Sequence, residues 1–196
     1  MSVGMAMTAK QVPQPPARRP DAARNRDKIL AAARGAFGEP QAEVSMAEVA
    51  RRAGVGMATL YRNFPGRREL LEALFADEVD AICAAAETMG GGTPGAALTA
   101  WLHRFFAFVT SKRPIAAELL QHTDRDDPVF GANRDRVIAA GEPLFAAATA
   151  AREIRDDVTF EQTLDLVIAI ASIHRDGRYV EPILQTALDG LRPRRG

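Results

Sequence analysis

The chain has 196 residues, of which 47% are hydrophobic, and its 25 Lys and Arg balance 25 Asp and Glu. These values argue against a disordered chain and are typical of one large or two small folded domains. One cysteine and three dispersed histidines argue against a disulfide framework and a metal site, so we expect neither a metal nor a cofactor. Because no apolar run is long enough for a membrane span or a secretory signal, we expect a cytoplasmic protein without a membrane partner.

The balanced charge is unevenly distributed along the chain. Residues 1–76 contain 12 Lys and Arg against 7 Asp and Glu, and the remaining residues carry the matching acidic excess. This asymmetry predicts that the first third of the chain faces a polyanion. Arginine accounts for 22 of the 25 basic residues, which suits phosphate recognition but also fits a GC-rich genome, and we give the genomic explanation the larger share.

The N-terminal residues differ in composition from those that follow. Residues 1–20 contain four prolines and almost no apolar periodicity, which predicts a disordered, basic and proline-rich arm. From residue 21 apolar residues recur at helical spacing among charged ones, as Ile29, Leu30, Ala33 and Phe37. This pattern predicts an amphipathic helix that ends near Gly38.

Two short helices are predicted next. Ser45 and Glu48 have the spacing of a capping box, in which the serine hydroxyl accepts from the Glu48 amide and the Glu48 carboxylate reaches back to the serine amide. We expect Gly54 to end the first helix with a positive φ angle, and residues 57–64 to form the second. Two short helices joined by a glycine turn form a helix-turn-helix, here at about residues 45–64.

The rest of the chain is also predicted to be helical. Helical spacing favours helices at 67–89, 94–111, 114–121, 128–151, 159–174 and 178–191, with Thr93 capping the helix that starts at Pro94. No stretch alternates as a strand does, so we predict an all-α fold of about nine helices. The expected domains are residues 21–82 and 83–191, with a flexible tail at 192–196.

Three stretches between Asn25 and Ala73 resemble the N-terminal domain of the TetR family of bacterial transcriptional repressors. They are Ile29-Leu30-Ala31-Ala32-Ala33 with Phe37, Ser45 to Phe64, and Pro65 to Leu71. The resemblance implies a three-helix DNA-binding domain followed by a helical bundle for effector binding and dimerisation. It also implies a ligand-responsive regulator rather than an enzyme. The resemblance further implies a homodimer that represses transcription by binding a palindromic operator. A small apolar or amphipathic effector then releases the dimer from the DNA.

The chemistry and the resemblance together select candidate DNA contacts. The second helix of the helix-turn-helix enters the major groove, so its exposed face needs small or polar residues and a close approach of the backbone. Ser45, Thr59, Tyr61 and Arg67 are expected on phosphates, while Met57, Ala58 and Asn63 are the likelier readers of base edges. The full predicted set is Arg24, Ser45, Gly56, Met57, Ala58, Thr59, Tyr61, Arg62, Asn63 and Arg67.

The last two predicted helices suit a dimer contact, since the resemblance implies that two helices from each protomer pack together. The predicted interface comprises Leu164, Val167, Ile168, Ala171, Val180, Ile183, Leu184, Ala187 and Leu188. The alternative is that these apolar faces belong to the core of a single chain.

The middle helices are where the resemblance implies an effector pocket. Its candidate lining residues are Trp101, Phe105, Phe108, Leu119, His122, Phe130 and Phe145. An aromatic stripe at helical spacing is more often core than pocket, and that alternative stays open.

A second function class is a helical-bundle enzyme or small-molecule carrier whose N-terminal domain serves only assembly. The chain contains no nucleophile elbow, phosphate loop, dinucleotide fingerprint or metal motif, which disfavours the enzyme.

Overall fold

The computed structural model describes residues 18–39, 44–121 and 127–193, and in these ranges all of the regular secondary structure is α-helix. The eight helices are α1 (Arg18–Gly38), α2 (Met46–Ala53), α3 (Met57–Asn63), α4 (Arg67–Glu87), α5 (Pro94–Leu119), α6 (Pro128–Ala150), α7 (Phe160–Ala171) and α8 (Gly177–Asp189). The predicted all-α class is therefore confirmed. None of the described helices combines the length and hydropathy that a bilayer crossing requires.

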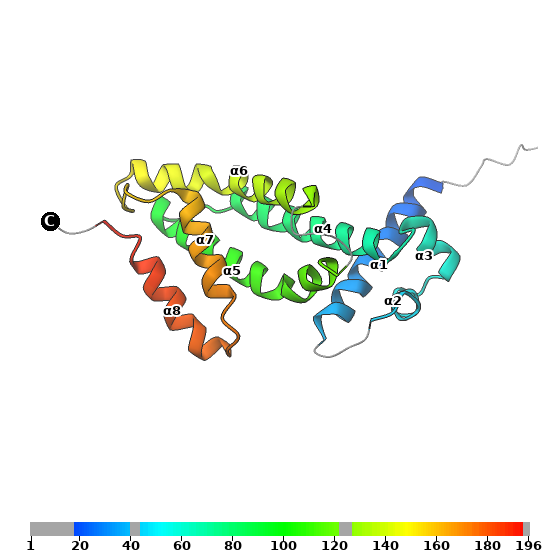
Figure 1. Ribbon diagram of the computed structural model, residues 1–196. Helices are drawn as coiled ribbons and strands as arrows, with labels where there is room; N and C mark the ends of the chain where they lie inside the picture. The colour runs from blue at the N-terminus through cyan, green and yellow to red at the C-terminus, as the bar shows by residue number, and fades with distance from the viewer. Residues whose placement is uncertain (1–17, 40–43, 122–126, 194–196) are drawn as a thin grey trace, which may run out of the picture.

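The helices form two regions, which Figure 1 shows at opposite ends of an elongated molecule. We call α1, α2, α3 and the first half of α4 the head, and the rest of α4 with α5–α8 the body. Helix α4 runs from the head into the body, where it packs against α5 and α6. The predicted boundary between residues 82 and 83 falls inside this continuous helix.

Each region has its own hydrophobic core. In the head, Ile29 of α1, Leu60 of α3 and Leu70 of α4 are fully buried together. In the body, the core is centred on Trp101 of α5 and Phe160 of α7. Burial of one such side chain contributes about 1.5–3 kcal/mol, so each region has an apolar centre that stabilises its own helices.

The predicted helices at 94–111 and 114–121 are wrong as separate elements, because α5 continues through Pro114. A proline inside a helix removes a backbone hydrogen bond and costs about 3 kcal/mol. Beyond it, Ile115 and Leu119 are buried in the core of the head. Their burial offsets that cost and keeps the helix intact, which is why the described residues form eight helices and not nine.

The ends of the chain also differ from prediction in detail. Helix α1 begins at Arg18, so the last three residues of the expected arm are helical, and residues 1–17 lie outside the described residues. Leu191 is buried against the body, which leaves Arg192 and Pro193 as the described part of the expected tail.

The turn between α2 and α3 has the predicted glycine geometry. Gly54 adopts φ 65° and ψ 32°, and its amide donates to the carbonyls of Ala50 and Arg51. A Cβ atom at this position would meet no atom within 4 Å, so the conformation rather than space requires glycine. This turn sets the angle at which α3 leaves α2.

Candidate nucleic-acid interface

Helix α3 presents a continuous exposed face. Met57 and Tyr61 lie one turn apart with 39% and 47% of their surfaces exposed, and Ala58 and Arg62 are exposed beside them. Leu60 on the opposite side is fully buried and anchors the helix to the head. A methionine and a tyrosine held outward on a short anchored helix provide apolar and hydrogen-bonding surface for a partner.

Two residues predicted to contact DNA are turned partly inward. Thr59 and Asn63 are half-buried. The Asn63 amide donates to the Thr59 carbonyl at 2.8 Å, and the Thr59 hydroxyl accepts from Arg62 at 2.9 Å. Asn63 therefore uses one amide hydrogen on its own helix, and its second amide hydrogen and its oxygen remain for the predicted contact with a base edge.

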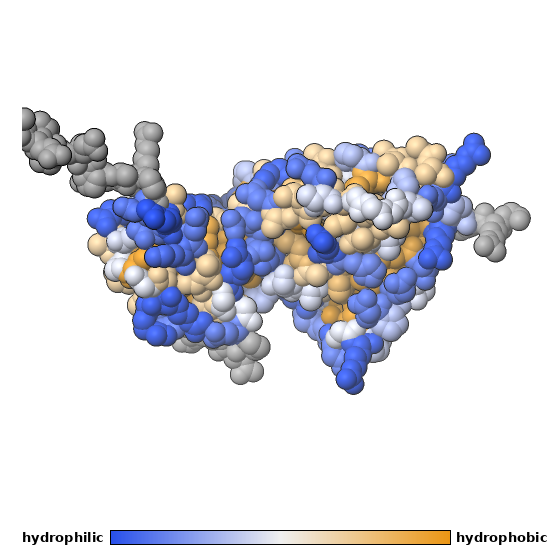
Figure 2. Space-filling view, turned by 180° about the vertical axis from the view of Figure 1, so that it is seen from behind, coloured by the Kyte–Doolittle hydropathy of each residue, from blue (hydrophilic) through white to orange (hydrophobic). Residues whose placement is uncertain are grey.

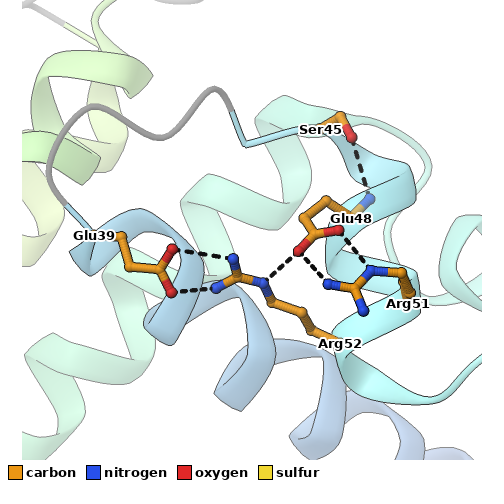
Figure 3. Close-up of polar contacts among 5 residues, drawn as sticks. All are labelled: Glu39, Ser45, Glu48, Arg51 and Arg52. Atoms are coloured by element: carbon orange, nitrogen blue, oxygen red, sulfur yellow. Dashed lines mark hydrogen bonds and ion pairs between the residues drawn. The ribbon is translucent and has the colours of Figure 1, made fainter.

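Ser45 caps α2, although only half of the predicted capping box is present. Its hydroxyl oxygen accepts from the Glu48 amide at 3.1 Å. The Glu48 carboxylate accepts from the guanidinium groups of Arg51 and Arg52, at 2.6–2.8 Å, instead of from the Ser45 amide (Figure 3). The side chain of Ser45 is exposed, and the hydroxyl hydrogen is not used by the cap.

The same carboxylate belongs to a surface network that joins α2 to the end of α1. Arg52 bridges Glu48 to Glu39, with its Nη1 2.5 Å from a Glu39 oxygen (Figure 3). Hydrogen bonds from Arg51 and Arg52 lower the pKa of Glu48 to about 2, because they stabilise its charged form. These carboxylates balance the two arginines of α2, so the basic excess of the head comes from residues outside this network.

Arg67, predicted to contact phosphate, is engaged within the chain. Its guanidinium lies 2.8–2.9 Å from the Glu118 carboxylate of α5 and donates to the Val44 carbonyl. The same group lies 5.2 Å from the centre of the Phe37 ring. Arg67 therefore joins the head to the body, and sequence reasoning missed this because its partners lie far away along the chain.

The basic residues of α1 lie in two different environments. Arg24 pairs with Asp21 at 2.6 Å on the same helix. The guanidinium of Arg26 lies 5.3 Å from the ring centre of Phe64, directly after α3. Arg26, Lys28 and Arg62 form no ion pair with a carboxylate of the described residues. Arg26 of α1 therefore lies next to the end of α3. No pattern in the sequence indicates that these two residues are neighbours.

A second set of charges joins α1, α4 and α5. Arg34 of α1 binds both Asp77 and Glu78, and Lys112 of α5 lies 2.8 Å from Glu78. Burial alone raises the pKa of Glu78, but hydrogen bonds from Lys112 and Arg34 outweigh it and lower the pKa. Together with Arg67, these contacts fix the orientation of the head on the body.

Comparisons with known proteins agree on one family. The model of the bacterial regulatory proteins of the tetR family matches residues 29–74, and the model of the C-terminal domain of SbtR-like transcriptional regulators matches residues 93–193, about half of the chain. The chain belongs to the TetR family. It is therefore a DNA-binding, ligand-responsive transcriptional regulator and not an enzyme, and α2–α3 is its helix-turn-helix.

Solved structures of TetR regulators show the same architecture over most of the chain. One from Streptomyces coelicolor is 35% identical with a TM-score of 0.71, covering 87% of this chain and 99% of that chain. Another from Mycobacterium vanbaalenii is 30% identical with a TM-score of 0.71, covering 89% and 99%. A regulator from Haloarcula marismortui, at 15% identity and a TM-score of 0.67 over 86% and 97%, shares the fold. No curated protein sequence matches this chain.

The TetR body contains a cavity of about 120 Å³ between α4, α5, α6 and α7. Of the predicted pocket residues, Phe105, Phe108 and Phe130 line it. The others do not: Trp101 and Phe145 are buried in the body core, Leu119 is buried in the head core, and His122 lies outside the described residues. Sequence reasoning missed Phe75 and Val79, which line the cavity from α4.

The predicted dimer residues of this TetR regulator separate into two groups. Six are buried within the chain itself, so the alternative of an ordinary core holds for them: Leu164, Val167, Ala171, Val180, Leu184 and Leu188. Ile168 is exposed, and Ile183 and Ala187 line an open apolar groove. Leu166 of α7 and Pro182 of α8 also line this groove, and sequence periodicity did not select them.

Proposed function

We propose that this TetR regulator is a repressor that binds a palindromic operator as a homodimer and leaves it when a small apolar molecule enters the cavity of the body. The observation that carries the proposal is the exposed face of α3, held out by the buried Leu60. The major groove of B-DNA is about 12 Å wide and admits an α-helix, so α3 can enter it with this face toward the bases.

Each exposed residue has a role in this proposal. Met57 and Ala58, at the start of α3, contact base edges, because N-terminal residues of a recognition helix approach the bases. Tyr61 and Arg62 bind phosphate oxygens, as does the Ser45 hydroxyl through its unused hydrogen. Arg26, next to the end of α3, adds a further phosphate contact in place of Arg67, which is engaged with Glu118.

The apolar groove on α7 and α8 is the proposed dimer contact. Leu166 lines this groove and is exposed, and Ile168 of α7 and Tyr179 of α8 are further large hydrophobic residues exposed on the same two helices. Ile183 also lines the groove and packs partly buried against the body core. Pairing of two copies across a two-fold axis buries these residues and presents two α3 helices to one duplex. A palindromic operator with half-sites roughly 34 to 36 Å apart, or a multiple of that distance, matches such a pair.

Release of the operator follows from the position of the cavity along α4. Phe75 and Val79 line the cavity, while Asp77 and Glu78 on the same turn hold Arg34 of the head. A molecule that moves residues 75–79 therefore acts on the contacts that orient the head. Binding of that molecule favours a conformation in which the two recognition helices no longer match the groove spacing.

A gel-shift assay with the DNA flanking the coding region tests the proposal. At physiological salt, a fragment from this region should bind more tightly than random duplex of the same length, and equal affinity for both would contradict it. A reporter placed behind the bound fragment separates the two directions of regulation. Expression should fall when the protein is present, whereas a rise would identify an activator.

A further inference from the structure

We propose that the cavity of the body takes an uncharged molecule with a single aromatic ring and one hydrogen-bonding group, of the phenol class. This inference rests on the proposed effector role of the cavity and names the chemistry of its ligand.

The volume of the cavity limits the size of the ligand. It measures about 120 Å³. An apolar protein cavity of about 150 Å³ stays free of water and binds benzene. A single substituted ring therefore matches the space between the helices.

Aromatic side chains from three helices surround this space. Phe75 of α4 meets Phe130 of α6 edge to face, with ring centres 5.8 Å apart, and lies 6.5 Å from the ring of Phe108. Phe108 lies 6.1 Å from Phe105 in a stacked arrangement. Rings that already pair at these distances and tilts offer their remaining edges and faces to another ring beside them, because edge and face carry opposite partial charges.

The charges at the cavity disfavour an ionic ligand. Among the described residues that line it, Arg134 alone is ionisable. Its guanidinium lies 3.1 Å from Asp165 and 3.7 Å from Glu161 on α7. A cation entering the cavity would meet Arg134, and an anion would compete with two carboxylates already in place. Either ion would also lose hydration among phenylalanine rings, and the guanidinium of Arg134 at the cavity is already paired with carboxylates.

Asn133 supplies the polar contact. It is buried, and its amide donates to the Val129 carbonyl at 2.8 Å while its oxygen accepts from Arg136 at 3.3 Å. An asparagine amide has two hydrogens and its oxygen has two lone pairs, so one hydrogen and one lone pair remain for a ligand. A hydroxyl on the ring satisfies either of them, which favours phenol over toluene.

The test is direct binding of four probes to the purified full-length protein, by calorimetry without DNA. Phenolic hydroxyls have a pKa of about 10, so phenol is uncharged at neutral pH and should bind most tightly. Toluene should bind roughly fivefold more weakly for want of one hydrogen bond. Benzoate and benzylammonium should bind at least tenfold more weakly than phenol. Tighter binding of either ion than of phenol would overturn the proposal.

Two variants locate the site. Val109 lines the cavity and Val158 packs elsewhere against the same core, so Val109→Phe should abolish phenol binding and the matched control Val158→Phe should retain it. Phenol binding that survives in Val109→Phe would place the ligand elsewhere. Asn133→Leu is a second test, and it does not depend on whether the Val109→Phe variant folds. It should bring the affinities for phenol and toluene together, and an unchanged preference for phenol would overturn the role of Asn133.

Release of DNA is measured separately, with the fragment identified by gel shift. Phenol that binds and also displaces the fragment supports both proposals. Phenol that binds with the predicted selectivity but leaves the DNA bound supports the ligand class and contradicts the effector role of the cavity. A failure of all four probes to bind the free protein overturns the ligand class, whatever the DNA measurement shows.

Discussion

The head and the body use their residues in different ways. In the head, the residues proposed to meet DNA are exposed on α3, and the core beneath them depends on other residues such as Leu60. In the body, the residues proposed to meet the ligand are themselves core residues, such as Phe105 and Val137. One face of the molecule illustrates the contrast, with hydrophobic residues gathered over the body and mainly hydrophilic residues over the head (Figure 2). Function and stability are therefore separable in the head and combined in the body.

The largest effect is expected in the body, from Gly141→Ala. A Cβ atom there would lie 2.7 Å from Trp101 Cη2 and closer still to the Phe160 ring. Because both rings are buried, we expect a loss of about 3 kcal/mol in the free energy of unfolding, measured by urea denaturation. Gly131→Ala, on the same helix with no atom within 4 Å, is the matched control and should not destabilise. Equal stability of the two variants would contradict the close packing.

The second effect concerns the junction of the two regions. Arg67→Ala removes the hydrogen bonds to Glu118 and Val44, and should lower the free energy of unfolding by about 2 kcal/mol. Because Glu118 and Val44 already hold the Arg67 guanidinium, we expect the salt dependence of DNA binding to keep its slope. Arg62→Ala is the control and should reduce that slope by about one. A flattened slope in Arg67→Ala with unchanged stability would restore the sequence-based prediction.

The third effect tests the separability of function and stability in the head. Tyr61→Ala removes an exposed side chain, so the melting temperature should stay the same while affinity falls about tenfold on specific and random DNA alike. Gel-shift titration measures the affinity and circular dichroism measures the melting. Tyr61→Phe distinguishes the hydroxyl from the ring, and a loss confined to specific DNA would show that Tyr61 reads bases.

The smallest effect is a pH dependence that belongs to the head. The pKa of Glu48 is about 2, below its usual value of 4.5, so the charged form stabilises the fold above about pH 4.5 and this contribution is lost as the pH falls toward 2. Glu48→Gln should melt at a lower temperature than the wild type at pH 6, and the difference should shrink through this window. A difference that does not depend on pH would contradict the ion pairs of Glu48.

Much of the head could be predicted because its features are local. In the head, the Ser45 cap and the positive φ of Gly54 each depend on residues within a few positions of one another, as does the start of α5 at Thr93 and Pro94 in the body. Local backbone geometry and short-range hydrogen bonds determine such features, so they are readable along the chain. The same holds for the all-α class, which follows from helical periodicity.

The sequence by itself therefore determined the all-α class, most of the helices, the capping roles of Ser45 and Thr93, and the family resemblance. Only the tertiary structure decided that Arg67 binds Glu118, that α5 passes through Pro114, and which apolar faces of α7 and α8 remain uncovered. Periodicity shows that a helix has an apolar face but does not show what covers it. Partners separated by about fifty residues meet only when whole helices pack, and that packing depends on the shape of every neighbouring side chain.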